Sequence, residues 1–356
     1  MKTIKIIFFV ILFISFITNS LKPQIPDELD FGAYLDVYYA TDSDKGTNPR
    51  RFVSISPYRD QFRVNIAQLS ASYNSEIIRG NLVVNWGDIP DFNGPDDFRY
   101  VQQANVGVSP WKNFWFDAGM FLSHLGFESF PKDNYLSSFS LVSYYEPFYE
   151  MGIKINYDFS EKFSAGMVLV NGFNTFSDNN KSKTVGLQLY YRPFENVSIN
   201  YSNLFGNEMP DSLNAKYRLH NNLFVTYSPS EKIDLVGSVD FGFQEKSKLS
   251  NPQATAYMTG GFVTARYKFT PKFNVALRGE FLDDPSGYLS GTFNSSPTEL
   301  QGLKAFGLTL GLEYKPVEKA YIRVESRYLK STNIPDLFNE NKNYRGEVTF
   351  SIGYEY

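Results

Sequence analysis

The stretch "EYKPVEKAYIRVESRY" at residues 313–328 contains a short corner that recurs along the chain. It joins an aromatic residue, a Pro or Ser and a charged or amide residue to a run in which apolar residues occupy every second position. Close variants occur at 157–169, 191–203, 227–239 and 267–279. Pro presets a turn dihedral, and Ser and Asn hydrogen-bond the local backbone. The repetition therefore predicts a series of tight turns, each leading into a β-strand.

Alternation of apolar and polar residues extends through the chain, and no segment has a convincing helical period. The alternating runs predict sixteen strands, at about 31–40, 62–73, 77–87, 98–108, 113–122, 148–157, 163–171, 185–192, 197–205, 217–228, 233–243, 256–268, 273–282, 303–314, 320–330 and 346–356. The connections between them alternate strictly between short and long. Such alternation is typical of an antiparallel up-and-down meander with tight turns on one rim and long loops on the other.

Two architectures accommodate these strands: a soluble sandwich and a transmembrane β-barrel of about 16 strands. Three observations favour the barrel. Aromatic residues make up 17% of the chain and gather at both ends of the apolar stripes, where membrane girdles lie. The chain begins with a secretory-type segment, and its final run "VTFSIGYEY" ends on an aromatic residue, as the terminal strands of outer-membrane barrels do. We therefore expect an all-β membrane barrel with short periplasmic turns and long outer loops.

The N-terminus has the composition of a signal peptide. Lys2 and Lys5 precede an uncharged apolar run at 6–17, which is too short to span a bilayer as a helix. We expect residues 1–20 to be removed, with cleavage near 20–24, and residues 25–356 to form the barrel. The absence of cysteine excludes disulfides, and a formal net charge of −4 disfavours nucleic acid as a partner.

Several stretches resemble the OmpL-like β-barrel porins of diderm bacterial outer membranes. The most characteristic stretch is "KDNYLSSFSLVSYYEPFYEMGIKINYDF" at 132–159; "LVNGFNTFSDNNKSK" at 169–183 and "FGNE" at 205–208 are two more. The matching positions are Asn134, Ser138, Pro147, Tyr149, Gly152, Tyr157, Asn171, Gly172 and Asn174. Where the family has a basic residue near 137 or 138, this chain has two serines. The resemblance covers nearly the whole mature chain and implies an integral outer-membrane porin, without naming a substrate.

The 25-residue connection 123–147 is the most informative candidate site. It follows the fifth strand, where sixteen-stranded porins fold a loop into the lumen, and it is too apolar to extend into water. We expect it to be an inward-folded constriction loop; the alternative is an extra hairpin at 136–145. In the first case its acidic residues face a basic lumen wall. The candidate pore-lining residues are Glu128, Asp133, Glu146, Arg266, Arg278 and Arg323. The alternative for the three arginines is local pairing with Glu280, Glu313 and Glu325.

The function that follows is passive diffusion of small hydrophilic solutes through a polar lumen. Outer-membrane lipid and such solutes are then the partners, and a homo-oligomer is compatible with this class. A barrel with a plugged lumen and partner-binding surface loops is the alternative function. Neither His124 nor His220 belongs to a lipase-like motif, so we expect no enzyme activity. We also expect no cofactor and no metal.

Overall fold

The computed structural model describes residues 26–46, 48–178 and 180–356, so the predicted signal peptide lies outside the described residues. The elements are β1 (Leu29–Asp42), β2 (Phe62–Asn74), β3 (Ile78–Trp86), α2 (Asp88–Asn93), β4 (Val101–Val108), β5 (Phe114–Leu122), β6 (Tyr149–Ser160), β7 (Phe163–Val170), β8 (Thr184–Phe194), β9 (Val197–Asn207), β10 (Tyr217–Ser230), β11 (Ile233–Gln244), β12 (Ala256–Thr270), β13 (Phe273–Asp283), β14 (Phe293–Ser296), β15 (Glu299–Gln301), β16 (Lys304–Tyr314), β17 (Ala320–Ser331) and β18 (Tyr344–Glu355). Among the described residues, no helix has the length and apolar character to cross a bilayer.

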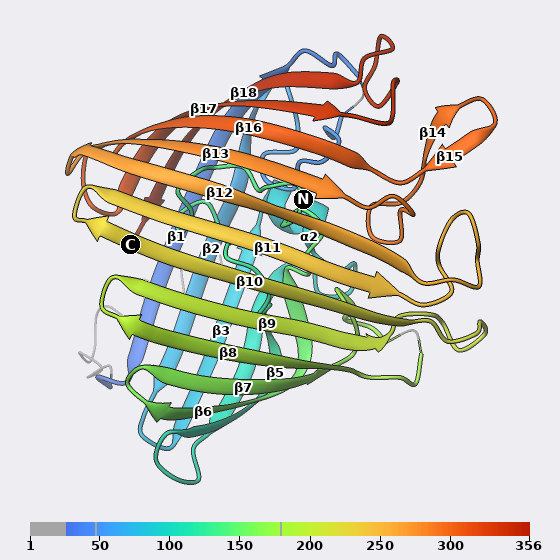
Figure 1. The fold of residues 1–356 in the computed structure, drawn as a ribbon. Helices are drawn as coiled ribbons and strands as arrows, with labels where there is room; N and C mark the ends of the chain where they lie inside the picture. The colour runs from blue at the N-terminus through green and yellow to red at the C-terminus, as the bar shows by residue number, and fades with distance from the viewer. Residues whose placement is uncertain (1–25, 47, 179) are drawn as a thin grey trace, which may run out of the picture.

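Sixteen of these strands form one closed antiparallel barrel (Figure 1). Each pairs with its neighbours in sequence, except that β13 pairs directly with β16, and β1 closes the ring against β18. Closure satisfies the backbone hydrogen-bonding groups of every strand, which is necessary within a bilayer. The predicted fold and all sixteen predicted strands are confirmed.

Residues on the outer face of the barrel are apolar, and those on the inner face are polar. In β16 the exposed residues are Phe306, Leu308, Leu310 and Leu312, whereas Thr309 between them is fully buried. Leu308 is 53% exposed, compared with 0% for Thr309. This inverted alternation is the pattern of a strand with lipid on one side and a filled or watery lumen on the other.

The two ends of the barrel differ as predicted. The turn end carries the short connections; there the hydroxyls of Ser160 and Thr270 accept hydrogen bonds from the backbone of the tight turns. The loop end carries the long connections, which include α2 and the β14–β15 hairpin that projects at the right of Figure 1. These two elements were not predicted. The alternative of a hairpin at 136–145 is wrong, since no strand forms there.

Candidate functional site: the loop inside the barrel

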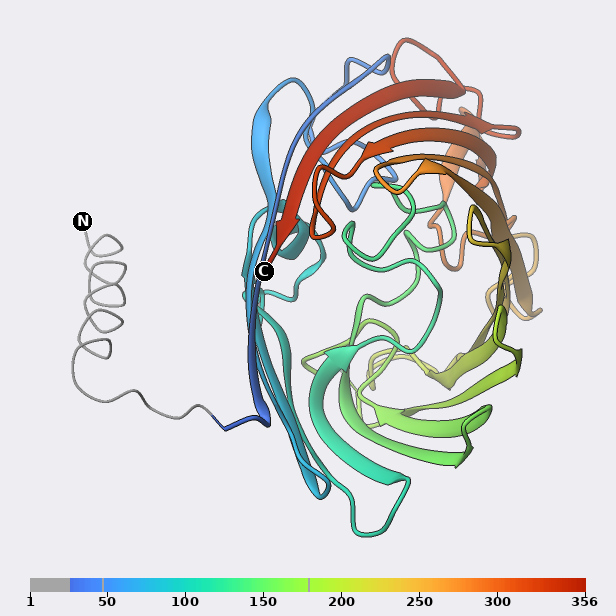
Figure 2. The same ribbon diagram turned by 90° about the vertical axis from the view of Figure 1, so that its left-hand side faces the viewer.

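The segment 123–147, between β5 and β6, crosses the interior of the ring of strands (Figure 2). Its apolar side chains are buried, among them Leu125, Phe130, Leu136, Phe139, Leu141 and Val142. Gly311 of β16 makes room for it, because a Cβ there would lie 2.4 Å from Cδ2 of Leu136. We refer to segment 123–147 as the inner loop.

Arg278 of β13 is the most extensively bonded anchor of the inner loop. Its Nη1 donates to Oε1 of Glu128 at 2.6 Å and to the carbonyl of Ser138 at 2.7 Å. Its Nη2 donates to the Ser138 hydroxyl at 2.9 Å and to the Phe139 carbonyl at 3.0 Å. Arg278 is fully buried, so these bonds form away from bulk water. One wall side chain thus binds both arms of the inner loop.

Strand β17 supplies a second anchor. Nη1 of Arg323 donates to the carbonyl of Pro131 at 2.5 Å, and its Nη2 donates to the carbonyl of Asn134 at 2.9 Å. Two residues further along β17, Oε2 of Glu325 accepts the backbone N–H of Ser137 at 2.7 Å. The period of a strand places both wall residues on its inner face.

Glu280 of β13 links the inner loop to the basic residues of the wall. Its Oε2 accepts the backbone N–H of Leu141 at 2.5 Å, and its Oε1 accepts Nε of Arg327 at 2.8 Å. Arg278 lies 3.7 Å from the same carboxylate. Local ion pairs and contacts with the inner loop therefore share the same charged groups at Arg278 and Glu280.

Of the candidate residues, Glu128 and Arg278 come together as an ion pair, and Arg323 pairs locally with Glu313 at 2.6 Å. Arg266 pairs with Asp234 at 2.6 Å. Its guanidinium also lies 4.0 Å from the ring centroid of Tyr135, a residue of the inner loop.

The other two acidic candidates do not pair with this wall. Asp133 is exposed; partial burial, and then the Glu355 carboxylate, raise its pKa, while Lys132 and Arg323 act against that rise. Glu146 lies elsewhere, where Asn222 of β10 donates to its carboxylate at 3.2 Å. Burial, and then the neighbouring carboxylate of Asp240, raise the pKa of Glu146 well above its ordinary value.

His124 begins the inner loop with an ion pair to the wall. Its Nδ1 lies 2.8 Å from Oε1 of Glu150, and its Nε2 lies 3.0 Å from the carbonyl oxygen of Asn203. Burial alone would lower the pKa of His124, but the Glu150 carboxylate and the hydrogen bonds outweigh it and leave the pKa raised above 6.5.

A basic group near the loop end was missed as a site by the sequence reasoning. Arg50, from the connection between β1 and β2, lies 3.1 Å from the Glu347 carboxylate, which Arg345 approaches to 2.9 Å and Arg327 to 3.6 Å. Because side chains alternate between the two faces of a strand, Arg327 lies on the same inner face of β17 as Arg323. No periodic signal locates Arg50, because its position depends on how a long irregular connection folds.

The loop end is also filled by apolar side chains from distant segments. Phe52 from the connection between β1 and β2 packs with Ile334, Leu337 and Phe338 from the connection between β17 and β18. Leu141 of the inner loop belongs to the same cluster. The long connections therefore fold inward over the inner loop.

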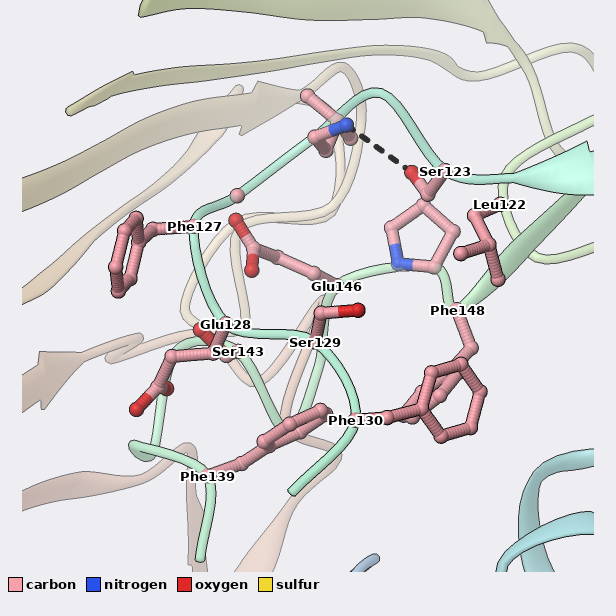
Figure 3. Close-up of a pocket in the computed structure, with 13 residues that line it drawn as sticks. Leu122, Ser123, Phe127, Glu128, Ser129, Phe130, Phe139, Ser143, Glu146 and Phe148 are labelled. Atoms are coloured by element: carbon pink, nitrogen blue, oxygen red, sulfur yellow. Dashed lines mark hydrogen bonds between the residues drawn. The ribbon is translucent and has the colours of Figure 1, made fainter. Parts of the chain in front are cut away.

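A cavity of about 120 Å³ lies within the inner loop (Figure 3). Its lining includes Ser123, Phe127, Phe130, Ser143 and Glu146. The Ser123 hydroxyl accepts the backbone N–H of Leu125 at 3.1 Å, the bond drawn in Figure 3. The inner loop thus has an internal structure of its own and encloses polar atoms.

A closed antiparallel barrel with an apolar exterior, a polar interior and an internal loop defines the class of porin-like outer-membrane barrels. The chain belongs to the family described as "Putative beta-barrel porin-2, OmpL-like", whose model matches residues 28–355. Its location is accordingly the bacterial outer membrane. No curated protein sequence matches the chain.

Solved outer-membrane proteins share the fold at low sequence identity. The chain is similar to OmpTdeltaL8, a loop-deletion mutant of OmpT from Vibrio cholerae, with TM-score 0.62, 12% identity, and 92% of this chain and 99% of that chain covered. It is similar to an anion-selective porin from Comamonas acidovorans, with TM-score 0.61, 11% identity and coverage of 92% and 99%. The outer-membrane channel DcaP of Acinetobacter baumannii has TM-score 0.58, 13% identity and coverage of 92% and 97%.

Proposed function

We propose that the protein is a porin through which small hydrophilic solutes diffuse passively, with the inner loop as its constriction. The observation that carries the proposal is the attachment of this loop to charged wall residues. Arg278, Arg323 and Glu325 hold its backbone inside a barrel whose inner face is polar. A loop so held narrows the path across the membrane and places charges beside it, which filters solutes by size and charge.

Deleting residues 125–142 tests the constriction. The purified variant in planar bilayers should give larger single-channel conductance than the wild-type protein. Deletion of the β14–β15 hairpin, which lies in an outer connection, is the matched control and should leave conductance nearly unchanged. If the variant lacking 125–142 has the same single-channel conductance as the wild-type protein, the inner loop is not the narrowest point of the channel.

The apolar cluster at the loop end favours a second candidate, a barrel with a plugged lumen that presents its outer connections to a partner. The two functions differ in one measurement. A porin gives steady open channels and swelling of liposomes in sugar solutions, whereas a plugged barrel gives neither.

The contacts of the two histidines differ from those that a barrel hydrolase requires. His220 contacts Asp240, and His124 contacts Glu150 and a backbone carbonyl, so these contacts do not include the serine hydroxyl that a barrel hydrolase requires. Lipid hydrolysis by the wild-type protein that disappears in His220→Ala would contradict this assignment.

Solved relatives support a homo-oligomer, since one structure of the Vibrio cholerae OmpT is a trimer form. We propose that this barrel also associates with its own copies in the membrane. Analytical ultracentrifugation in detergent measures the stoichiometry directly, and a monomer under mild extraction would exclude stable association.

A further inference from the structure

Three potential metal ligands meet where the inner loop returns to the wall. Glu146 comes from the end of the inner loop, His220 from β10 and Asp240 from β11. One nitrogen or oxygen atom from each lies within 4.8 Å of the other two. Nε2 of His220 and Oδ2 of Asp240 are 2.6 Å apart.

The one basic side chain among the three ligands is His220, which contacts Asp240. All three side chains are buried, and neither carboxylate forms an ion pair with a lysine or arginine within the described part of the chain. Buried carboxylates are costly unless they are neutralised or bind a cation. Arg278 and Arg323 neutralise other acidic groups of the lumen, but their partners are Glu128, Glu280 and Glu313.

A fourth side chain has an unused polar atom at the same place. Nδ2 of Asn222 lies 2.8 Å from Oδ1 of Asp240 and 3.2 Å from Oε1 of Glu146, while its buried Oδ1 has no hydrogen-bond partner. The two ends of an amide are exchangeable by a half-turn. That rotation would break the bonds from Nδ2 to Glu146, Asp240 and Ser238 and turn the Asn222 oxygen toward the two carboxylates, where it could serve as a ligand once a cation is bound. Nδ1 of His220 is likewise buried and unpaired.

Glu146 of this group lies between a close backbone contact and a small cavity. Gly126 has φ +80°, and a Cβ there would lie 2.3 Å from Oε2 of Glu146. The cavity within the inner loop also reaches Glu146, whose side chain appears among Phe127, Ser129 and Ser143 in Figure 3. The lining of this cavity includes Glu146 but not His220, Asp240 or Asn222, so the cavity offers room for a water bound beside Glu146 rather than for the cation itself.

We propose that Glu146, His220 and Asp240 bind one divalent transition-metal cation, of which Zn²⁺ is the representative, with Asn222 or a water as a further ligand. An imidazole with two carboxylates suits Zn²⁺ better than Mg²⁺ or Ca²⁺, which prefer oxygen ligands throughout. The metal would connect the inner loop to β10 and β11. It would then secure the returning arm of the loop, on strands other than the β13 and β17 anchors.

Zinc binding to the folded, chelator-treated full-length chain in detergent tests the proposal. Isothermal titration calorimetry, with metal analysis after gel filtration, should show one Zn²⁺ per chain that Ca²⁺ and Mg²⁺ do not displace. Co²⁺ in place of Zn²⁺ should give visible absorption bands that report the ligand geometry. These readouts do not depend on channel activity, so they stand apart from the porin proposal.

Ligand variants identify the site. Glu146→Gln and Asp240→Asn keep the shape of the side chains and should weaken Zn²⁺ binding by roughly 100-fold or more, since even loss of an outer-shell contact costs 10–100-fold. His124→Gln removes the other histidine, whose partner is Glu150, and should bind as the wild type does. Heat-modifiable gel migration verifies folding, and Glu146→Gln, outside the strands, covers the case in which Asp240→Asn fails to fold. Absence of Zn²⁺ binding by the wild type, or equal binding by Glu146→Gln, would overturn the proposal.

Discussion

Replacing Arg278 with alanine should detach the inner loop from β13 without opening the barrel. The substitution removes four hydrogen bonds, of 2.6–3.0 Å, to Glu128, Ser138 and Phe139. It also leaves Glu128 buried without a cation. The other oxygen of that carboxylate holds the backbone N–H of Ser140 at 2.7 Å, so the loss extends along the loop.

The magnitude follows from the burial of the pair. Removing one member of a buried ion pair costs about 3–5 kcal/mol, because the remaining charge stays uncompensated. Part of this cost is relieved when the loop moves and Glu128 reaches water. If about 3 kcal/mol of this cost lowers the free energy of detaching the inner loop, the detached population rises roughly 100-fold, because about 1.4 kcal/mol corresponds to a factor of ten.

Amide hydrogen exchange of the folded protein in detergent measures this population. Protection of Ser140 and its neighbours should fall by roughly 100-fold in Arg278→Ala, while the strand amides keep theirs. Arg79→Ala is the matched control, because Arg79 also forms a wall ion pair, with Asp117 at 2.5 Å, on strands away from β13. Equal protection of Ser140 in wild type and Arg278→Ala would refute the assignment of Arg278 as the principal anchor.

Three further changes probe other parts of the molecule. The raised pKa of His124 means that its pair with Glu150 stabilises the protein fully below about pH 6.5 and loses this effect as the pH rises through the folded-state pKa. Histidine NMR titration should give a pKa above 6.5. The difference in urea midpoint between the wild type and His124→Gln should shrink with rising pH. Gly126→Ala places a Cβ against Glu146 at a residue with positive φ, and this backbone strain should destabilise the inner loop by about 1–3 kcal/mol. The change is measured as faster proteolysis of 123–147, and an unchanged cleavage rate would contradict the predicted strain. Leu310→Arg puts a charge on the lipid face of β16 and should cost about 2–4 kcal/mol near the bilayer midplane, measured by urea unfolding from vesicles; an unchanged midpoint would place Leu310 outside the hydrocarbon.

The sequence alone determined the strands, their number and which face of each is apolar. These features are local, because a period of two and a turn signal such as the one at 269–272 can be recognised in the sequence without knowing which strand pairs with which. The same two-residue alternation predicted that Arg278, Arg323 and Arg327 lie on the inner face of the barrel. The apolar content of 123–147 indicated that it needs a surface to bury against, and the structure supplies one in the lumen wall.

Only the tertiary structure decided which charged groups meet. Arg278 reaches Glu128 across 150 positions of sequence, and Glu146 meets His220 and Asp240 rather than the arginines. Such pairings depend on the path of an irregular loop through a closed barrel, and no residue period encodes that path. Curvature brings strands distant in sequence to the same interior, so the partners of each buried charge are fixed by closure of the sheet and not by the strand that carries it.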